Sequence, residues 1–131
     1  MLEDEGYQLM GAAFEVHNQL GYGMAEEVYQ QSLEIELGIR GVPFQAKQEL
    51  AVFYKNRRLD THYKPDLLVF SLIVVELKAV SELNPDHDAQ LFNYLRIARH
   101  PVGYLINFGR KNQLEWRRFV ISDMYKKETE H

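Results

Sequence analysis

Residues 62–80, HYKPDLLVFSLIVVELKAV, form the most apolar stretch of this 131-residue chain, and yet Asp66, Glu76 and Lys78 lie within it. A charged side chain is costly to bury in a sheet unless it is paired or binds something. Side chains alternate between the two faces of a strand, so Glu76 and Lys78 share one face and Leu77 projects from the other. We therefore expect one face to be core and the other to carry chemistry or to meet solvent.

The same stretch predicts two strands joined by a tight turn at Ser71. If the loop is odd in length and centred on Ser71, Asp66 lies directly opposite Glu76, with Cβ atoms about 4.5–5.5 Å apart. Carboxylates that close repel one another, so the pair needs a raised pKa, a cation such as Lys78, or a divalent metal. An even-length loop would put the two acids on opposite faces. Glu76 and Lys78 would then be a solvent-facing polar edge, and Asp66 would merely begin its strand after Pro65.

Two helices are predicted before this stretch, over residues 3–19 and 24–39, because apolar residues recur there at helical spacing. The glycines of LGYG at 20–23 suit a helix end followed by a turn. In the first helix, the side chains expected to face inward are those of Tyr7, Met10, Phe14 and His17. In the second, the expected inward face holds Val28, Tyr29, Ser32, Leu33 and Leu37, and the outward face Glu27, Gln30, Gln31 and Glu34.

The rest of the chain alternates between strand and helix patterns. A β-hairpin is predicted around Asn56, and further strands at 66–70, 72–80, 102–108 and 114–122. A helix is predicted from Asn84, as N-cap before Pro85, to about His100. The order α-α-β-β-β-β-α-β-β predicts an α/β fold, a mixed sheet flanked by helices in a single domain. Its parts are two N-terminal helices (3–40), a core of sheet and helix (44–122) and a frayed tail (123–131).

Composition and charge narrow the class of protein. The chain has no cysteine, which excludes disulfides and thiolate zinc sites, and it has no apolar run long enough to cross a membrane, so we expect a soluble, cytoplasmic protein. The formal net charge is −4, but it is unevenly distributed. Residues 1–46 hold eight acids against one arginine, whereas residues 47–118 hold twelve Lys or Arg against eight acids. The middle segment could therefore meet an anionic partner, although mixed charge is equally typical of ordinary surface.

Several motifs together carry a resemblance to a known family. KPDLLVF followed by VVELK resembles the signature of the PD-(D/E)XK nuclease superfamily, with Asp66 on one strand and Glu76-Leu77-Lys78 on the next. EVHNQLGYGMAEEVYQQSLEIELGIRG resembles the motif of the GxxExxY family within it; the matching positions are Gly23, Glu26 and Tyr29. LNPDHDAQLFNYL and GYLINF are similar to the helix and strand that follow in that family. The resemblance covers about residues 5–121 and implies a restriction-endonuclease-like core.

The resemblance implies a metal-dependent nuclease that hydrolyses phosphodiester bonds of nucleic acid, and we expect that nucleic acid to be DNA. Mg²⁺ or Mn²⁺ would be held by Asp66 and Glu76, with the Leu77 carbonyl as a third ligand. This agrees with the preference of Mg²⁺ for oxygen donors. Lys78 would stabilise the charge that develops on the phosphorus centre. Glu26 would be a third acid that binds a second ion or a metal-bound water; by spacing alone it is also a surface glutamate at a helix N-terminus.

The helix predicted after the Glu76 strand would present Gln90 to the active site. Tyr94 is one turn further along the same face, where it either packs or contacts substrate. His17 and His87 are interpreted as structural. Other substrate contacts are expected from basic residues around the first hairpin: Lys47, Lys55, Arg57, Arg58 and Lys64. The same residues would equally suit an exposed hairpin whose edge is protected by charge.

The alternative function is a catalytically silent nuclease fold that serves as a binding or interaction module. The retained Asp66, Glu76, Lys78, Glu26 and Gln90 favour the enzyme. The negative net charge of the chain and its small size favour the binding module. A lone domain of this size offers little surface for binding a duplex. A homodimer would enlarge that surface.

Overall fold

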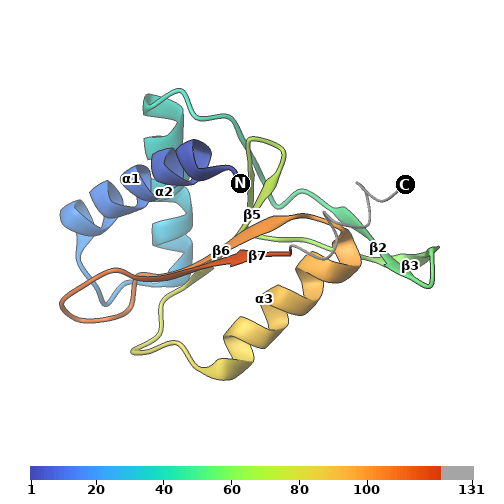
Figure 1. Cartoon of the computed structure of the whole chain (residues 1–131). Coiled ribbons are helices and arrows are strands. Elements are labelled where there is room, and N and C mark those ends of the chain that lie inside the picture. Colours follow the sequence, from blue (N-terminus) through green and yellow to red (C-terminus); the bar gives the residue numbers. More distant parts are fainter. Residues whose placement is uncertain (122–131) are drawn as a thin grey trace.

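The structure, a computed structural model, describes residues 1–121 (Figure 1). The described part consists of α1 (Glu3–Leu20), α2 (Glu26–Ile39), β1 (Phe44–Ala46), β2 (Leu50–Tyr54), β3 (Arg57–Tyr63), β4 (Leu67–Val69), β5 (Ile73–Lys78), α3 (Pro85–Ala98), β6 (Val102–Asn107) and β7 (Glu115–Val120). None of these helices is both long and apolar enough to span a bilayer. The predicted tail, residues 123–131, lies outside the described residues.

The main sheet has the strand order β1-β4-β5-β6-β7, and β2 and β3 form a separate hairpin. Strands β5 and β6 are parallel and are joined through α3, whereas the other neighbours are antiparallel. The predicted mixed α/β sheet is thus confirmed, with one short strand more than expected. That strand, β1, pairs with β4 at the edge of the sheet.

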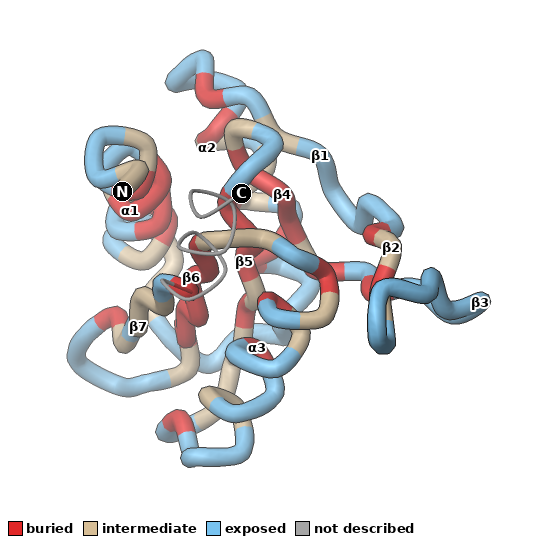
Figure 2. Tube along the Cα trace, turned by 45° about the vertical axis from the view of Figure 1, so that its right-hand side comes forward, coloured by how far each residue is buried: buried red, intermediate tan, exposed pale blue. Residues whose placement is uncertain are grey.

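Helices cover both faces of the sheet. On one face α1 and α2 pack against Ile73, Val75 and Leu77 of β5. On the other face α3 and the β2–β3 hairpin pack around Val74 and Leu105. Figure 2 shows buried backbone running through the central strands, with exposed backbone along the outer sides of the helices and over the hairpin. The face that carries Glu76 is therefore a second core over much of its length, which differs from the expected division into one apolar and one chemical face.

The turn between β4 and β5 sets the register of the site. Phe70 and Ser71 both have positive φ, 55° and 61°, and the Leu72 N–H donates to the Val69 carbonyl at 3.2 Å. Val69 pairs with Ile73, so three residues form the loop and Ser71 is its centre. The predicted odd-length register is confirmed.

The buried face of α1 differs from the prediction. Tyr7 is 82% exposed and Phe14 is also exposed, whereas Leu9 and Val16 are buried along with Met10. The prediction was confirmed for Met10 and wrong for Tyr7 and Phe14. Small residues (Gly6, Ala12 and Ala13) occupy much of the buried face, and the two aromatic side chains lie outside it.

The buried face of α2 is partly as predicted. Tyr29, Leu33 and Leu37 are fully buried, but Val28 is 41% exposed and Gln30, expected outside, is only 3% exposed. The reason is a hydrogen bond: Gln30 Nε2 donates to the Asp66 carbonyl at 2.9 Å. A buried amide is tolerated when it is paired in this way, and periodicity alone does not reveal such a partner.

Helix α3 begins as predicted. The Asn84 side chain accepts from the N–H groups of Asp86 and His87, and Pro85 occupies the first turn. His87 Nδ1 in turn accepts from the Asn84 N–H at 3.1 Å. This reciprocal cap satisfies donors that a helix start would leave unpaired, and it gives His87 a structural role.

Candidate functional site

Asp66 and Glu76 face each other at the point where β4 and β5 begin to separate. The Asp66 N–H donates to Glu76 Oε1 at 2.9 Å, and the Leu77 N–H donates to Asp66 Oδ2 at 2.7 Å. Each carboxylate is therefore oriented by a backbone N–H of the neighbouring strand. The tight turn at Ser71 brings the two groups together from positions ten residues apart in the sequence.

The surroundings of Glu76 disfavour its charge. Burial, together with the nearby Asp66 carboxylate, raises the pKa of Glu76 to about 7. The Asp66 N–H and the Lys78 ammonium act in the opposite direction but do not offset the burial. Two carboxylates held together in a partly dry site would gain from a bound cation.

Asp66 already forms an ion pair with Lys47. Lys47 Nζ lies 2.9 Å from Asp66 Oδ1, and the Lys47 N–H donates to the Asp66 carbonyl at 3.2 Å. Lys47 reaches this position from a left-handed backbone conformation with φ of 56°, which is uncommon for a residue other than glycine. The carboxylate raises the pKa of Lys47. Of the predicted substrate contacts, Lys47 is the one that lies in direct contact with the carboxylate pair.

The structure adds Gln30, which the sequence interpretation placed outside. It fixes the Asp66 carbonyl, and its Nε2 also donates to Glu34 Oε2 at 3.0 Å. Gln30 is one helical turn after Glu26, so the i to i+4 spacing from the predicted third acid was the signal that could have identified it.

Lys78 and Leu77 follow Glu76 on β5. Lys78 is half-buried and forms no ion pair with any residue in the described range 1–121. The Leu77 N–H points at Asp66. Because the N–H and C=O of a residue in a regular strand point to the same side, the Leu77 carbonyl projects toward the same edge.

Tyr63 and Tyr94 form the wall beside Glu76. Their rings stack with centroids 4.2 Å apart. The Tyr63 hydroxyl is buried beside the Glu76 carboxyl group. Burial, and then the charges of Glu76 and Asp66, raise the pKa of Tyr63 well above its usual value. A buried hydroxyl this close to the carboxylate pair can donate to a carboxylate or to a ligand oxygen.

Gln90 and Glu26 come from helices on opposite faces of the sheet. Gln90 is exposed on α3, one turn before Tyr94, and Glu26 is exposed in the first turn of α2. Neither makes a side-chain hydrogen bond or ion pair with Asp66, Glu76 or Lys78.

The other two residues of the Gly23-Glu26-Tyr29 motif shape the α1–α2 connection. Gly23 has φ of 101°, which favours glycine. Tyr29 is fully buried, and its hydroxyl donates to the Gly21 carbonyl at 2.7 Å and accepts from the Met24 N–H at 3.3 Å. The Tyr29 ring stacks on Phe108 at 4.7 Å. The motif thus fixes the loop that presents Glu26.

The remaining predicted contacts lie on the β2–β3 hairpin and just after it. Arg57 and Arg58 are exposed near its tip, and Lys64 follows β3, 3.8 Å from Glu49. The structure does not bring Arg57 or Arg58 to the carboxylate pair.

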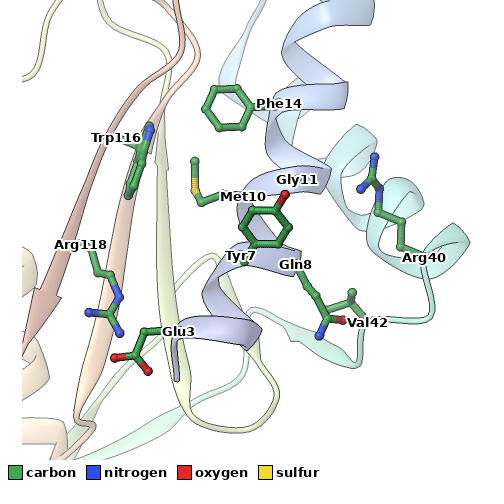
Figure 3. Close-up of a pocket in the computed structure, with 10 residues that line it drawn as sticks. All are labelled: Glu3, Tyr7, Gln8, Met10, Gly11, Phe14, Arg40, Val42, Trp116 and Arg118. Carbon is green, nitrogen blue, oxygen red and sulfur yellow. The ribbon is translucent and has the colours of Figure 1, made fainter. Parts of the chain in front are cut away.

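An apolar hollow of about 800 Å³ lies elsewhere, between α1 and β7. Figure 3 shows Met10, Phe14 and Trp116 on its walls, with Arg40 and Arg118 toward opposite sides. None of its lining residues belongs to the Asp66–Glu76 site. The chemistry-bearing residues and this hollow are therefore separate features.

The carboxylate pair fits a hard divalent cation. Both side chains offer oxygen, the Leu77 carbonyl faces the same edge, and the like charges would be relieved by a cation. Within residues 1–121, no group of three or more His, Asp or Glu side chains is arranged to hold a metal. Mg²⁺ typically takes one or two carboxylates and keeps several waters, so two carboxylates suffice.

Comparisons with known proteins concern the fold and the family of the chain. The chain is similar in fold to the crystal structure of a protein called SSO0001, with a TM-score of 0.55 and 15% sequence identity. The similarity covers 79% of this chain and 55% of that one, so this chain spans little more than half its length. A search of curated proteins found no match. The family model described as the PD-(D/E)XK nuclease superfamily matches residues 3–119. The chain therefore belongs to the PD-(D/E)XK nuclease superfamily.

Proposed function

We propose that this protein is a metal-dependent nuclease that hydrolyses phosphodiester bonds of nucleic acid, and that the nucleic acid is DNA. One observation carries the proposal: Asp66 and Glu76 are held face to face by backbone N–H groups, in a site where burial and the neighbouring carboxylate both disfavour a charged Glu76. Membership of the nuclease superfamily supports the same chemistry. The Gly23, Glu26 and Tyr29 positions further suggest the GxxExxY branch of that superfamily.

Asp66, Glu76 and the Leu77 carbonyl would hold Mg²⁺ or Mn²⁺. Bound there, the ion would polarise a phosphoryl oxygen and make water at the site more acidic. The backbone N–H groups of Asp66 and Leu77 keep the two carboxylates oriented before any ligand arrives. This preorganisation reduces what must be rearranged during the reaction.

The other residues have distinct proposed roles. Lys78, half-buried beside Glu76, stabilises the negative charge that develops on the transferred phosphoryl oxygens. Gln90 on α3 and Glu26 on α2 would contact attacking water or substrate, as the family resemblance implies; both side chains are exposed and free to do so. Lys47 holds Asp66 in the free protein and is close enough to bind a substrate phosphate once Asp66 takes a cation. Tyr94, stacked on Tyr63, offers a ring to a substrate base.

A second candidate function is a nuclease fold that binds nucleic acid without cleaving it. The specific observation in its favour is the Lys47–Asp66 ion pair at 2.9 Å. An ammonium in that position takes one oxygen of a would-be metal ligand, which is how a site that has lost its ion could be neutralised.

Metal titration separates the two. We expect Mn²⁺ to bind the wild type in calorimetry, and Asp66→Asn and Glu76→Gln to weaken binding by more than about a hundredfold, because even groups that only support a ligand contribute 10- to 100-fold. Single-turnover assays on linear, branched and single-stranded DNA, and on RNA, then test cleavage. Lys78→Ala should bind the ion yet cleave more slowly than wild type.

The nuclease proposal is wrong if the wild type binds no Mn²⁺ and both carboxylate variants are simply more stable. Binding of nucleic acid without metal binding or cleavage would support the second candidate instead.

A further inference from the structure

The β2–β3 hairpin projects beyond the main sheet, at the opposite end of the molecule from the β6–β7 loop (Figure 1). In β3 every residue before Tyr63 is exposed, and Tyr63 itself is buried. Cationic side chains gather around its tip and on the adjoining end of α3. We call this cluster the hairpin arm; its members are Lys55, Arg57, Arg58, Arg96 and Arg99.

The charges of the hairpin arm are not neutralised within the described part of the chain. None of its five cations forms an ion pair with a residue in 1–121, and Asp60 is the one carboxylate on β3. The β6–β7 end is different, because Arg110 and Arg117 there both pair with Glu115. A concentration of unpaired positive charge at one end of an acidic protein creates a local field that attracts a polyanion.

Contacts with α3 hold the hairpin in place. The Arg99 guanidinium stacks over the Phe53 ring at 4.1 Å and donates to Asn56 Oδ1 at 2.8 Å. Near the base of the hairpin, Tyr63 stacks on Tyr94. A two-stranded hairpin is marginal by itself, so these contacts preorganise a surface that would otherwise have to be ordered on binding.

The arm and the carboxylate pair are connected by one strand. Tyr63, at the end of β3, lies beside Glu76, whereas Arg58 is at the other end. Arg58 pairs with Phe53 across the hairpin, so both project to the side where Arg99 lies. Five residues of extended chain span at most about 17 Å. The register shifts between Ala51 and Phe53, so that extra residues of β3 shorten this span further. Phosphates follow one another about every 3.4 Å along each strand of a duplex, so the span corresponds to at most about five base pairs.

We propose that the hairpin arm binds the sugar-phosphate backbone of nucleic acid within about five base pairs of the phosphodiester at Asp66 and Glu76. The substrate is then a polymer long enough to reach both the hairpin arm and the carboxylate pair. A short oligonucleotide bound at the carboxylate pair does not reach the arm. The proposal rests on the proposed function for the position of the reacting phosphate. Phosphate contacts carry no sequence information, so the arm contributes affinity and register without base specificity.

Binding measured without metal tests the arm independently of cleavage. Fluorescence anisotropy in EDTA would use labelled probes of about 24 base pairs, about 24 nucleotides single-stranded and about 6 nucleotides, across a range of salt concentrations. Arg58→Glu changes the charge of the arm, and Lys111→Glu makes the same change in net charge on the exposed β6–β7 loop. The two variants are therefore matched for overall charge.

For the long probes we expect Arg58→Glu to weaken binding by about tenfold, Lys111→Glu by less than about twofold, and Arg58→Ala to reduce the salt slope by about one. For the short probe the two glutamate variants should be alike. The long probe that shows the larger Arg58 effect identifies whether duplex or single strand lies on the arm.

Equal weakening by the two glutamate variants would overturn the proposal, as would an Arg58 effect that is independent of probe length. Failure of metal binding or cleavage, with the length-dependent Arg58 effect intact, would instead count against the nuclease proposal alone.

Discussion

Glu76 sits where three influences on its carboxyl group meet: burial, the Asp66 carboxylate and the Lys78 ammonium. Burial is the largest of them, and the result is a pKa of about 7. Near neutral pH, Glu76 in the metal-free protein therefore exchanges between its protonated and its ionised form. A metal that binds this pair displaces a proton, so its affinity rises with pH.

Glu76 should make the metal-free protein less stable as pH rises. Its pKa is raised in the folded state, so the folded protein holds a proton that the unfolded chain releases above its ordinary pKa of 4.5. The free energy of unfolding then falls as pH increases from about 5 to about 7, by on the order of 2–3 kcal/mol. Urea unfolding in EDTA measures this directly, and Glu76→Gln should abolish most of the slope.

Glu82→Gln is the control, because Glu82 is exposed outside the site. Its pH profile should follow that of the wild type. A wild-type free energy that is level over this pH range would contradict the account of Glu76.

Lys47 should compete with a divalent ion for Asp66. Since Lys47 Nζ lies 2.9 Å from Asp66 Oδ1, a metal must displace it or share the carboxylate with a positive charge. We expect Lys47→Ala to bind Mn²⁺ more tightly, by about threefold to tenfold, as measured by calorimetry. Lys64→Ala removes an exposed lysine that pairs with Glu49 instead, and should bind Mn²⁺ as the wild type does. Weaker Mn²⁺ binding by Lys47→Ala would show that the lysine supports the site rather than competing.

At the scale of the elements, a buried asparagine at the end of β6 holds the loop between β5 and α3. Asn107 Oδ1 accepts from the N–H groups of Val80 and Gly109, and its Nδ2 donates to the Val80 carbonyl and to Glu115 Oε1. Glu115 Oε1 also accepts from the Leu83 N–H. Although burial opposes it, these hydrogen bonds help to hold the pKa of Glu115 below its usual value. The loop between Lys78 and α3 is thereby tied to β6 and β7.

Asn107→Ala should therefore be strongly destabilising. It leaves several backbone groups of the loop and Glu115 without their partner, and each unsatisfied buried group costs about 1–3 kcal/mol. We expect a loss of about 3 kcal/mol in the free energy of unfolding, measured with urea. Asn93→Ala, which removes an exposed asparagine bonded to Arg96, should cost less than about 0.5 kcal/mol. Similar losses for the two variants would contradict this role of Asn107.

The elements differ in how far local sequence could predict them. The start of α3 was predictable because the Asn84 cap and Pro85 act within one turn of chain. The faces of α1 and α2 were not, because burial there depends on what each helix packs against. Tyr7 fits a helical repeat as well as Leu9 does. Gln30 points inward because it donates a hydrogen bond to the carbonyl of Asp66, thirty-six residues away.

At the scale of the whole molecule, the packing of α1 against the sheet can be tested at Gly6 in α1, with Gly38 in α2 as the comparison. Gly6 is buried against the Tyr104 ring and hydroxyl, which Arg118 also contacts, so an added Cβ would collide with a side chain that has little room to move. Gly38, near the end of α2, has nothing within 4 Å of an added Cβ. The same substitution should therefore have opposite effects at the two positions.

We expect Gly6→Ala to lower the free energy of unfolding by about 1–3 kcal/mol through overpacking. Gly38→Ala should raise it by up to about 1 kcal/mol, because alanine is the better helix former. Thermal and urea unfolding of both variants measure the difference. A Gly6→Ala protein as stable as Gly38→Ala would mean that α1 is not seated closely on β6.

Much of the fold and half of the candidate site could be predicted from local patterns. Residues 62–80 by themselves indicated two strands with a turn at Ser71, since strand alternation acts over neighbouring residues, and they made the meeting of Asp66 with Glu76 depend on a loop of odd length. The three-residue turn in the structure then decided that register. Only the tertiary structure decided that Lys47 and Gln30 both converge on Asp66, and that Tyr63 leaves a buried hydroxyl beside Glu76. Those contacts join segments far apart in the chain, where position depends on how whole layers pack and no local repeat specifies it.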